Sequence, residues 1–399
     1  MAKEVTCRIV NRVMLRKFVL VVHLWTGLVL GVWFSLLGLT GTLLVFHEAV
    51  DARLNPQLLR VTPRPERASL DAVLASARTR APDARLDRAV APLHEGGVWE
   101  VRYRSQGERF KALVDPHSAN LLAVRGEQGY FMGQVLHLHM NLLMGERGET
   151  LNGYGGLLVT LLLLTGVYLW WPRTWKQLPM RLKVARGISL KRTLFDLHNL
   201  FGIYTLPVLL LVTLTGSAFL FHAPTERLVY ALFGAPVEVQ ETPMVGGKMQ
   251  RSAQSLVDTA QKVAPEARVE RVYPNAQTDE PFSVRLLRSG VWKGDGFVTV
   301  DLNASTGQIV RVKDDAKAGG GERVMNWLSP LHFGTWAGFS SQLLWALIGL
   351  SPLSLFVTGV WMWGRKKLRK KRAGTTKEQQ ERRKAKSEPL VPQQKRHIQ

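Results

Sequence analysis

Four long apolar runs constrain this 399-residue chain more than any other feature of its sequence. A helix needs about 20 residues to cross the roughly 30 Å hydrocarbon core of a bilayer, and each run is long enough to do so. The first run is too long to be the core of a cleaved signal peptide, so we expect it to stay in the membrane. The runs cover Phe18–Phe46, Tyr154–Trp171, Leu197–Phe221 and Leu343–Trp363.

Lys and Arg flank these runs unevenly. They gather before the first run, between the second and third, and after the fourth, and such short basic segments stay on the cytoplasmic side. We therefore predict a multi-pass protein of the bacterial inner membrane with both termini in the cytoplasm. The expected segments are a cytoplasmic N-terminus (1–17), transmembrane helix 1 (18–47), a periplasmic segment (48–150), helix 2 (151–172), a cytoplasmic loop (173–196), helix 3 (197–222), a second periplasmic segment (223–340), helix 4 (341–363) and a basic cytoplasmic tail (364–399).

About half of the net charge of +22 lies in that tail, which holds fourteen Lys or Arg against three Glu. Such a run in a soluble protein indicates nucleic-acid binding. Here it directly follows an apolar helix and contains no aromatic residues, which favours a membrane anchor and no nucleic-acid partner. The single cysteine, Cys7, excludes an intrachain disulfide, an iron–sulfur cluster held by this chain and covalent c-type haem attachment.

An internal repeat relates the two halves of the chain. The first and third runs each carry a His-x3-Gly motif, a Leu-Thr-Gly motif and a terminal Phe-His, and their landmarks are shifted by 175 positions. The second and fourth runs each carry a Thr-Gly pair, at Thr165 and Thr358, and are shifted by 193 positions. Six of the ten histidines are therefore repeat-equivalent: His23 with His198, His47 with His222, and His139 with His332.

The two long connections also resemble each other. Each has an amphipathic helical segment followed by runs of alternating apolar and polar residues, a pattern typical of strands. The helices are expected at Leu70–Arg78 and Leu256–Lys262, and the strands at Val98–Arg104, Phe110–Val114, Phe282–Leu287 and Phe297–Asp301, each set followed by one more short strand. The expected fold is thus an all-α membrane core of four transmembrane helices, in two pseudo-symmetric pairs, with two periplasmic α+β modules.

These motifs resemble those of the PepSY-associated transmembrane-helix family, and the modules resemble PepSY domains. The resemblance covers residues from about 16 to 366. Within that family the chain is similar to inner-membrane ferric-siderophore reductases. This resemblance implies that the protein binds haem and reduces Fe(III)-siderophores in the periplasm, which releases the iron.

The histidine positions fit two haem b groups with bis-histidine ligation. A separation of 24 residues corresponds to about 36 Å of helix, so His23 and His198 lie near the cytoplasmic face, where they are expected to clamp one haem iron. The outer set consists of His47, His139, His222 and His332. It is expected to ligate a second haem, but the sequence leaves open which two of the four bind iron, or whether all four serve two haems.

The Thr-Gly pairs admit two interpretations, helix packing or close approach of a flat macrocycle. Thr40 lies seven residues before His47, as Thr215 does before His222, which places each pair on one helix face. The protein as a whole also has alternatives: a transporter that relays metal ions along its histidines, or a non-catalytic membrane-anchored PepSY module that binds or regulates a partner. The sequence has no recognisable nucleotide or flavin motif. The expected electron donor is therefore a separate cytoplasmic reductase or a quinol, and the catalytic residues are unknown.

Overall fold

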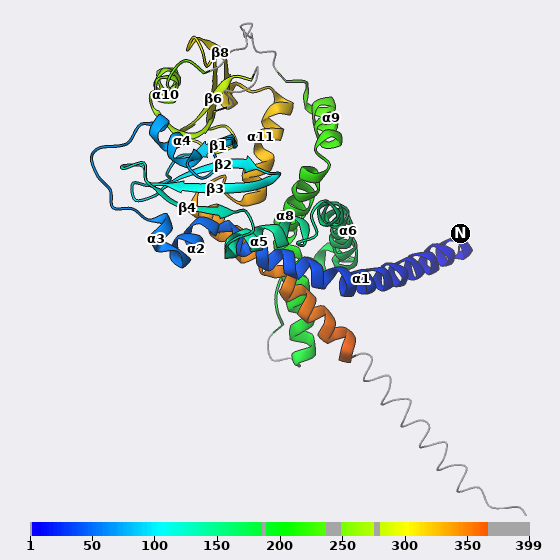
Figure 1. Cartoon of the computed structure of the whole chain (residues 1–399). Helices are drawn as coiled ribbons and strands as arrows, with labels where there is room; N and C mark the ends of the chain where they lie inside the picture. Colours follow the sequence, from blue (N-terminus) through cyan, green and yellow to red (C-terminus); the bar gives the residue numbers. More distant parts are fainter. Residues whose placement is uncertain (1, 186–188, 237–248, 275–279, 366–399) are drawn as a thin grey trace, which may run out of the picture. The chain divides into compact units, whose positions relative to one another are not determined.

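A computed structural model describes residues 2–185, 189–236, 249–274 and 280–365 (Figure 1). The chain divides into two compact units. Unit 1 comprises Met1–Val32, Leu164–Tyr204 and Pro352–Gln399, and unit 2 comprises Trp33–Leu163 and Thr205–Ser351. Each unit contains residues of all four membrane spans.

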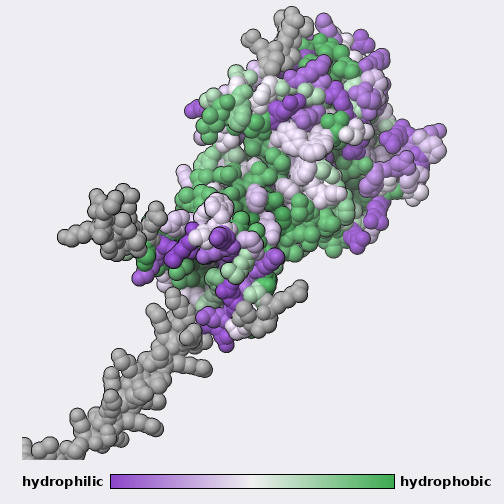
Figure 2. Space-filling model, turned by 180° about the vertical axis from the view of Figure 1, so that it is seen from behind, coloured by the Kyte–Doolittle hydropathy of each residue, from purple (hydrophilic) through white to green (hydrophobic). Residues whose placement is uncertain are grey.

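The structure has four helices that are long and apolar enough to cross a membrane, which confirms the expected number. Few of their side chains are buried inside the protein, and large apolar residues such as Val29, Leu161 and Leu347 are more than half exposed. Figure 2 shows such residues gathered into broad green areas of the surface. Burial in lipid explains this exposure better than contact with water. The spans are Val13–Val45 of α1 (Ala2–Val45), α6 (Glu146–Trp170), α8 (Leu190–Leu220) and Phe339–Arg365, which begins with α12 (Phe339–Gly349).

Short helices precede or follow these spans. Two of them carry candidate site residues: α5 (Phe131–Asn141) comes before α6, and α11 (Gly320–Phe333) comes before α12. The others are α2 (His47–Leu54), α3 (Pro56–Leu59), α4 (Leu70–Arg78), η1 (Trp175–Gln177), α7 (Leu178–Arg181), α9 (His222–Phe233), α10 (Ala253–Gln261) and η2 (Asp315–Lys317).

Unit 2 contains one antiparallel sheet of eight strands in the order β4-β3-β2-β1-β5-β6-β7-β8. The order is that of two four-stranded halves that meet where β1 pairs with β5. The strands are β1 (Arg85–Val90), β2 (Trp99–Ser105), β3 (Glu108–Val114), β4 (Leu121–Gly126), β5 (Ala267–Tyr273), β6 (Phe282–Arg288), β7 (Phe297–Leu302) and β8 (Ile309–Asp314).

Helices α4 and α10 cover one face of this sheet and form its hydrophobic core with residues such as Val73, Leu256 and Val101. Each helix begins at a serine, Ser69 or Ser252, whose side chain accepts a hydrogen bond from a backbone N–H of the first turn. The two N-termini are also linked to each other. The Asp71 carboxylate accepts hydrogen bonds from the backbone N–H groups of Ala253 and Gln254, at 2.7 and 3.0 Å.

The structure therefore joins what the sequence predicts as two separate modules into one sheet. The joining strands, β1 and β5, are the two that the sequence analysis missed. Each contains a register shift, between Leu86 and Arg88 in β1 and between Val269 and Arg271 in β5. A bulge breaks the alternation of apolar and polar residues by which strands are recognised in a sequence, and this explains why both were overlooked.

Candidate functional site

Four histidines make the same contact with a threonine on another helix. In each case the ring Nδ1 lies 2.9 Å from a threonine Oγ1: His23 with Thr165, His198 with Thr358, His139 with Thr40, and His332 with Thr215. In each case the threonine precedes a glycine. We call each such set a His–Thr–Gly cluster. Two clusters belong to unit 1 and two to unit 2.

The threonine hydroxyl sets the tautomer of the histidine. Thr40, Thr215 and Thr358 each donate their hydroxyl hydrogen to the backbone carbonyl four residues earlier, at 2.7–2.8 Å. The hydroxyl oxygen is then left with lone pairs, so the histidine Nδ1–H donates to it. A neutral imidazole protonated at Nδ1 carries its lone pair at Nε2. These three clusters therefore present Nε2 as the nitrogen that can bind a metal, and the cluster of His23 and Thr165 has the same distance between Nδ1 and the hydroxyl oxygen.

The glycine of each cluster lies against the imidazole ring. A Cβ built on Gly41, Gly166 or Gly216 would lie 3.1–3.3 Å from the Cε1 atom of the clustered histidine, which is tighter than most real contacts. At Gly359 the corresponding distance to His198 is 3.7 Å, an ordinary van der Waals contact. The absence of a side chain thus lets the imidazole approach the helix closely enough to reach the threonine. The sequence analysis considered helix packing or a flat macrocycle as the neighbour of these glycines. In the structure, the nearest side chain to each glycine is the imidazole of its cluster.

In unit 2, the histidines of two clusters face each other. The ring centres of His139 and His332 lie 6.5 Å apart with an angle of 59° between the ring planes. Two imidazole nitrogens bound at about 2 Å to one metal ion hold their ring centres about 6 Å apart. The separation of these two rings is therefore close to that of two imidazoles that bind one metal ion from opposite sides. We call His139 and His332 the second histidine pair.

In unit 1, His198 interacts electrostatically with His23, which indicates that these two rings are also neighbours. They form the first histidine pair. Their clusters have the same bond lengths as those of the second pair, so the same Nε2 atoms are presented.

Burial keeps the second pair neutral. It lowers the pKa of His139 to about 4, and burial together with the proximity of His139 lowers the pKa of His332 to about 3. Both histidines lie outside the four membrane spans. Neutral imidazole is the form that binds transition metals, so these two side chains would not have to lose a proton to bind one at neutral pH.

Two residues that the sequence analysis missed hold the helices of the second pair. The Asn152 side chain on α6 donates to the backbone carbonyls of His139 and Met140, at 2.8 and 2.7 Å, and accepts from Trp33. In the other half, the Trp345 indole N–H donates to the carbonyl of Leu331, at 2.8 Å. These positions are related by the 193-residue shift, but because one is Asn and the other Trp, a comparison of residue types gives no signal.

The structure does not bring His47 and His222 into either pair. They begin α2 and α9, their side chains are 57% and 63% exposed, and they lie near Glu48 and Glu226 respectively. Thr40 and Thr215, expected on the same face as these two histidines, bond instead to His139 and His332. That sequence-based association is wrong because both spans end before His47 and His222, at Val45 and Leu220. A ligand role for His47 and His222 stays a prediction.

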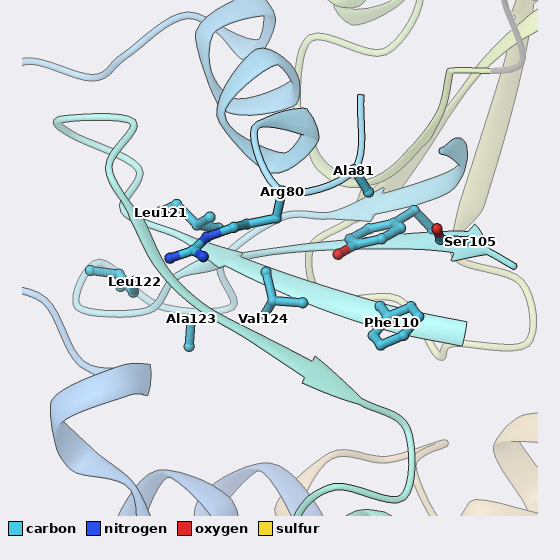
Figure 3. Close-up of a pocket in the computed structure, with 9 residues that line it drawn as sticks. Arg80, Ala81, Ser105, Phe110, Leu121, Leu122, Ala123 and Val124 are labelled. Carbon is cyan, nitrogen blue, oxygen red and sulfur yellow. The ribbon is translucent and has the colours of Figure 1, made fainter. Parts of the chain in front are cut away.

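A cavity of about 440 Å³ lies in unit 2 on the face of the sheet that α4 covers (Figure 3). Arg80, Phe110 and Val124 line it, together with Tyr103, which stacks on Phe110 with ring centres 5.6 Å apart. None of the histidines of the four clusters is among its lining residues. The cavity is therefore separate from the His–Thr–Gly clusters.

Within the described ranges of the chain, no group of three or more His, Cys, Asp or Glu side chains is placed to hold a metal ion. The four clustered imidazoles are grouped in twos.

Two comparisons with known proteins bear on this arrangement. The family described as "PepSY-associated TM region" matches residues 20–366. The chain is also 28% identical over 250 residues to the uncharacterized protein PA4219 of Pseudomonas aeruginosa. That match covers 57% of this chain and 62% of the Pseudomonas protein, so it spans less than two thirds of its relative.

Proposed function

The chain belongs to the PepSY-associated TM region family, and on this premise we propose that it is a haem-containing oxidoreductase of the bacterial inner membrane. It carries electrons from the cytoplasmic side to the periplasm, where they reduce the Fe(III) of a siderophore. The observation that carries the proposal is the fourfold bond between a histidine Nδ1 and a threonine hydroxyl, which presents four Nε2 atoms in two pairs.

The residues present fit haem b. His23 and His198 would hold one haem, and His139 and His332 a second. When bound, haem iron supplies reversible one-electron chemistry. The protein needs no cysteine for such ligation, and the threonine hydroxyls orient the imidazoles and raise their basicity, as the partners of metal-bound histidines generally do. Ligation would also give each buried imidazole a partner for its Nε2 atom, which would otherwise remain an unsatisfied polar group.

The direction of electron flow follows from the proposed topology. The basic segments before the first span, between the second and third spans and after the fourth are placed in the cytoplasm. The eight-stranded sheet of unit 2 then belongs to the periplasm, with the two long connections that form it. The donor is a separate cytoplasmic reductase or a quinol.

The substrate is a ferric chelate. Each Fe(III) accepts one electron and becomes Fe(II), which hard oxygen ligands bind far less tightly, so the electron itself releases the metal. No covalent bond to the chelator has to break. The work of the protein is to position the chelate and to hold the carriers of the electron.

An absorption spectrum tests the proposal directly. The full-length protein, expressed with ample haem supply and purified in detergent, should show a Soret band and, after reduction with dithionite, the sharp α and β bands of low-spin haem b. Adding a ferric siderophore without oxygen should return the oxidised spectrum and yield Fe(II), measured with a coloured Fe(II) chelator. A colourless protein would rule the proposal out, and a coloured protein that no ferric chelate reoxidises would rule out the reductase role.

A further inference from the structure

A row of cationic side chains crosses the eight-stranded sheet from edge to edge. Strand pairing places Arg125, Lys111, Arg102 and Arg88 opposite one another across β4, β3, β2 and β1. The other half continues with Arg271 on β5, Arg285 on β6 and, after Thr299 on β7, Lys313 on β8. We call these seven residues the cationic row. All of them belong to unit 2.

The row lies on the face opposite to α4 and α10. Side chains alternate between the two faces of a strand, and the sequence neighbours Val101, Ala112, Val272 and Val284 are fully buried in the core under those helices. The row is therefore held on the other face, where its members are half-buried: 28% of the Arg102 side chain and 11% of the Lys111 side chain are exposed.

This arrangement is unfavourable for the sheet itself. Like charges that lie directly opposite each other on neighbouring strands repel and destabilise the pairing. The row contains four such pairs of like charges. Three follow one another in the first half of the sheet, and one lies in the second half: Arg125 with Lys111, Lys111 with Arg102, Arg102 with Arg88, and Arg271 with Arg285. The central residues also repeat: Arg88 and Arg102 match Arg271 and Arg285 with the same shift of 183 positions. A repeated cost of this kind indicates a role other than stability.

Within the described ranges, carboxylates form ion pairs with five members of the row but with neither Arg88 nor Arg285. At the ends, Arg125 pairs with Asp51 and Lys313 pairs with Glu322. In the centre, Glu100 is shared between Arg102 and Lys111. Arg271 pairs with Glu270, at 3.0 Å.

Arg88, in the middle of the sheet, has no ion pair of its own within the described ranges, although the Tyr273 hydroxyl and the Glu100 carboxylate act on it electrostatically. The Nε atoms of Arg271 and Arg285 are buried, and in the described structure they have no hydrogen-bond partner. Burial lowers the pKa of Arg88, the guanidinium groups of Arg102 and Arg271 lower it further, and the opposite effects of Tyr273 and Glu100 are smaller. The Arg285 guanidinium lies over the Phe297 ring, at 3.7 Å, and Arg271 also donates to the Tyr273 hydroxyl, at 3.2 Å. The centre of the row thus carries positive charge that is met in part by these contacts, and Arg88 is the member with the most charge left for an anionic ligand.

The row is connected to the helices that carry the second histidine pair. Lys111 donates to the hydroxyl of Tyr130, at 2.8 Å, and Tyr130 is the residue that caps the start of α5, the helix of His139. At the opposite end, Glu322, the partner of Lys313, lies in the first turn of α11, the helix of His332. The charged face of the sheet therefore adjoins both helices of the proposed outer haem.

We propose that the centre of the cationic row, Arg88, Arg102, Arg271 and Arg285, binds the anionic oxygens of the ferric chelate, so that the substrates are chelates with net negative charge, such as carboxylate complexes. The inference rests on the proposed function and names the substrate class of that site. Guanidinium groups suit this task because their paired N–H donors match the geometry of carboxylates.

Binding of a redox-inert analogue tests the inference independently of electron transfer. Gallium(III) citrate is anionic and cannot be reduced under these conditions, and a neutral gallium trihydroxamate serves as the uncharged probe. Equilibrium dialysis against the detergent-purified full-length protein should show tighter binding of the citrate complex, weakened by salt. The double variant Arg88→Gln/Arg271→Gln should weaken that binding by about tenfold or more, because two charge-assisted contacts are lost.

The matched control is Arg85→Gln/Arg268→Gln, on the same two strands and related by the same 183-residue shift, but exposed. It should change the affinity for gallium citrate by less than about twofold, because exposed charges contribute little. Equal binding of both gallium complexes to the unmodified protein, or equal effects of the two double variants, would overturn the inference.

Haem propionates are the other source of carboxylates. If Arg88→Gln/Arg271→Gln shifts the midpoint potential or lowers the haem content but leaves the binding of gallium citrate unchanged, the row holds propionates and the substrate assignment is wrong. A protein without haem would refute the proposed function, whereas the dialysis result would still stand or fall by itself.

Discussion

The two histidine pairs are built from the same parts, but the helices exchange roles between them. In the first pair, the long helices α1 and α8 supply the imidazoles, and the second and fourth spans supply the Thr-Gly dipeptides. In the second pair, α1 and α8 supply the Thr-Gly dipeptides, and α5 and α11 supply the imidazoles. The constant feature is therefore the bond between Nδ1 and the hydroxyl, and not the helix on which the histidine lies.

The pairs differ in how their imidazoles are held. The first pair lies within long, continuous helices, whose own hydrogen bonds fix the backbone. The second pair lies on two short helices, and the side chains of Asn152 and Trp345 hold the backbone carbonyls at their ends. We infer that the second pair depends more on its supporting residues than the first.

Removing a proposed haem ligand should have the largest effect. His332→Ala should abolish the haem of the second pair and leave that of the first pair, and His198→Ala should do the reverse. Quantified haem content and the α-band of each variant measure this. His47→Ala and His222→Ala are the matched controls and should keep full haem content. Loss of haem in either control would indicate that the substituted exposed histidine is a haem ligand, and would contradict the assignment of the two pairs.

Removing a threonine hydroxyl should weaken haem binding without abolishing it. In Thr215→Val and Thr358→Val the imidazole loses the acceptor of its Nδ1–H, and loss of such a partner typically lowers affinity by about 10- to 100-fold. The imidazole also becomes a weaker donor to iron, so the midpoint potential should rise. Potentiometric titration measures both haems, and Thr→Ser at the same positions should restore the original potential. An unchanged midpoint potential in both valine variants would show that the threonine hydroxyls make packing contacts and do not tune the imidazoles.

Removing the support of α5 should affect the second pair alone. Asn152→Leu leaves the carbonyls of His139 and Met140 and the Trp33 N–H without their partner, at a cost of about 1–3 kcal/mol. The thermal midpoint should fall, with the second haem released first. Asn199→Leu is the control, because that exposed amide bonds only to Phe195 on its own helix. Equal release of both haems would contradict the inferred difference between the pairs.

Adding a methyl group beside the imidazole should have the smallest effect, and an unequal one. Gly216→Ala places a Cβ 3.1 Å from the His332 ring, whereas Gly359→Ala places it 3.7 Å from the His198 ring. The first substitution displaces the imidazole by a few tenths of an ångström, and the second fits without movement. Only Gly216→Ala should shift the spectrum of its haem. A larger shift in Gly359→Ala would show that the two rings are held differently from the structure described here.

The sequence predicted some elements well and missed others for an identifiable reason. Helix α4 occupies Leu70–Arg78, as expected, because its apolar residues recur with helical spacing and Ser69 marks its start. The β2, β3, β6 and β7 strands were expected within two residues of their observed ends. The bulged strands β1 and β5 were not expected, and with them the union of the two halves into one sheet was missed.

By itself, the sequence determined the number of membrane helices, the internal repeat and the set of histidines worth considering, since each of these follows from residue types and their spacing along the chain. Only the tertiary structure decided which histidine meets which threonine and which rings face each other. The four decisive hydrogen bonds join residues 99, 117, 142 and 160 positions apart. Contacts of that range depend on how helices pack, which local periodicity does not encode. The same holds for the cationic row, because strand register brings its seven charges from seven strands onto one face of the sheet.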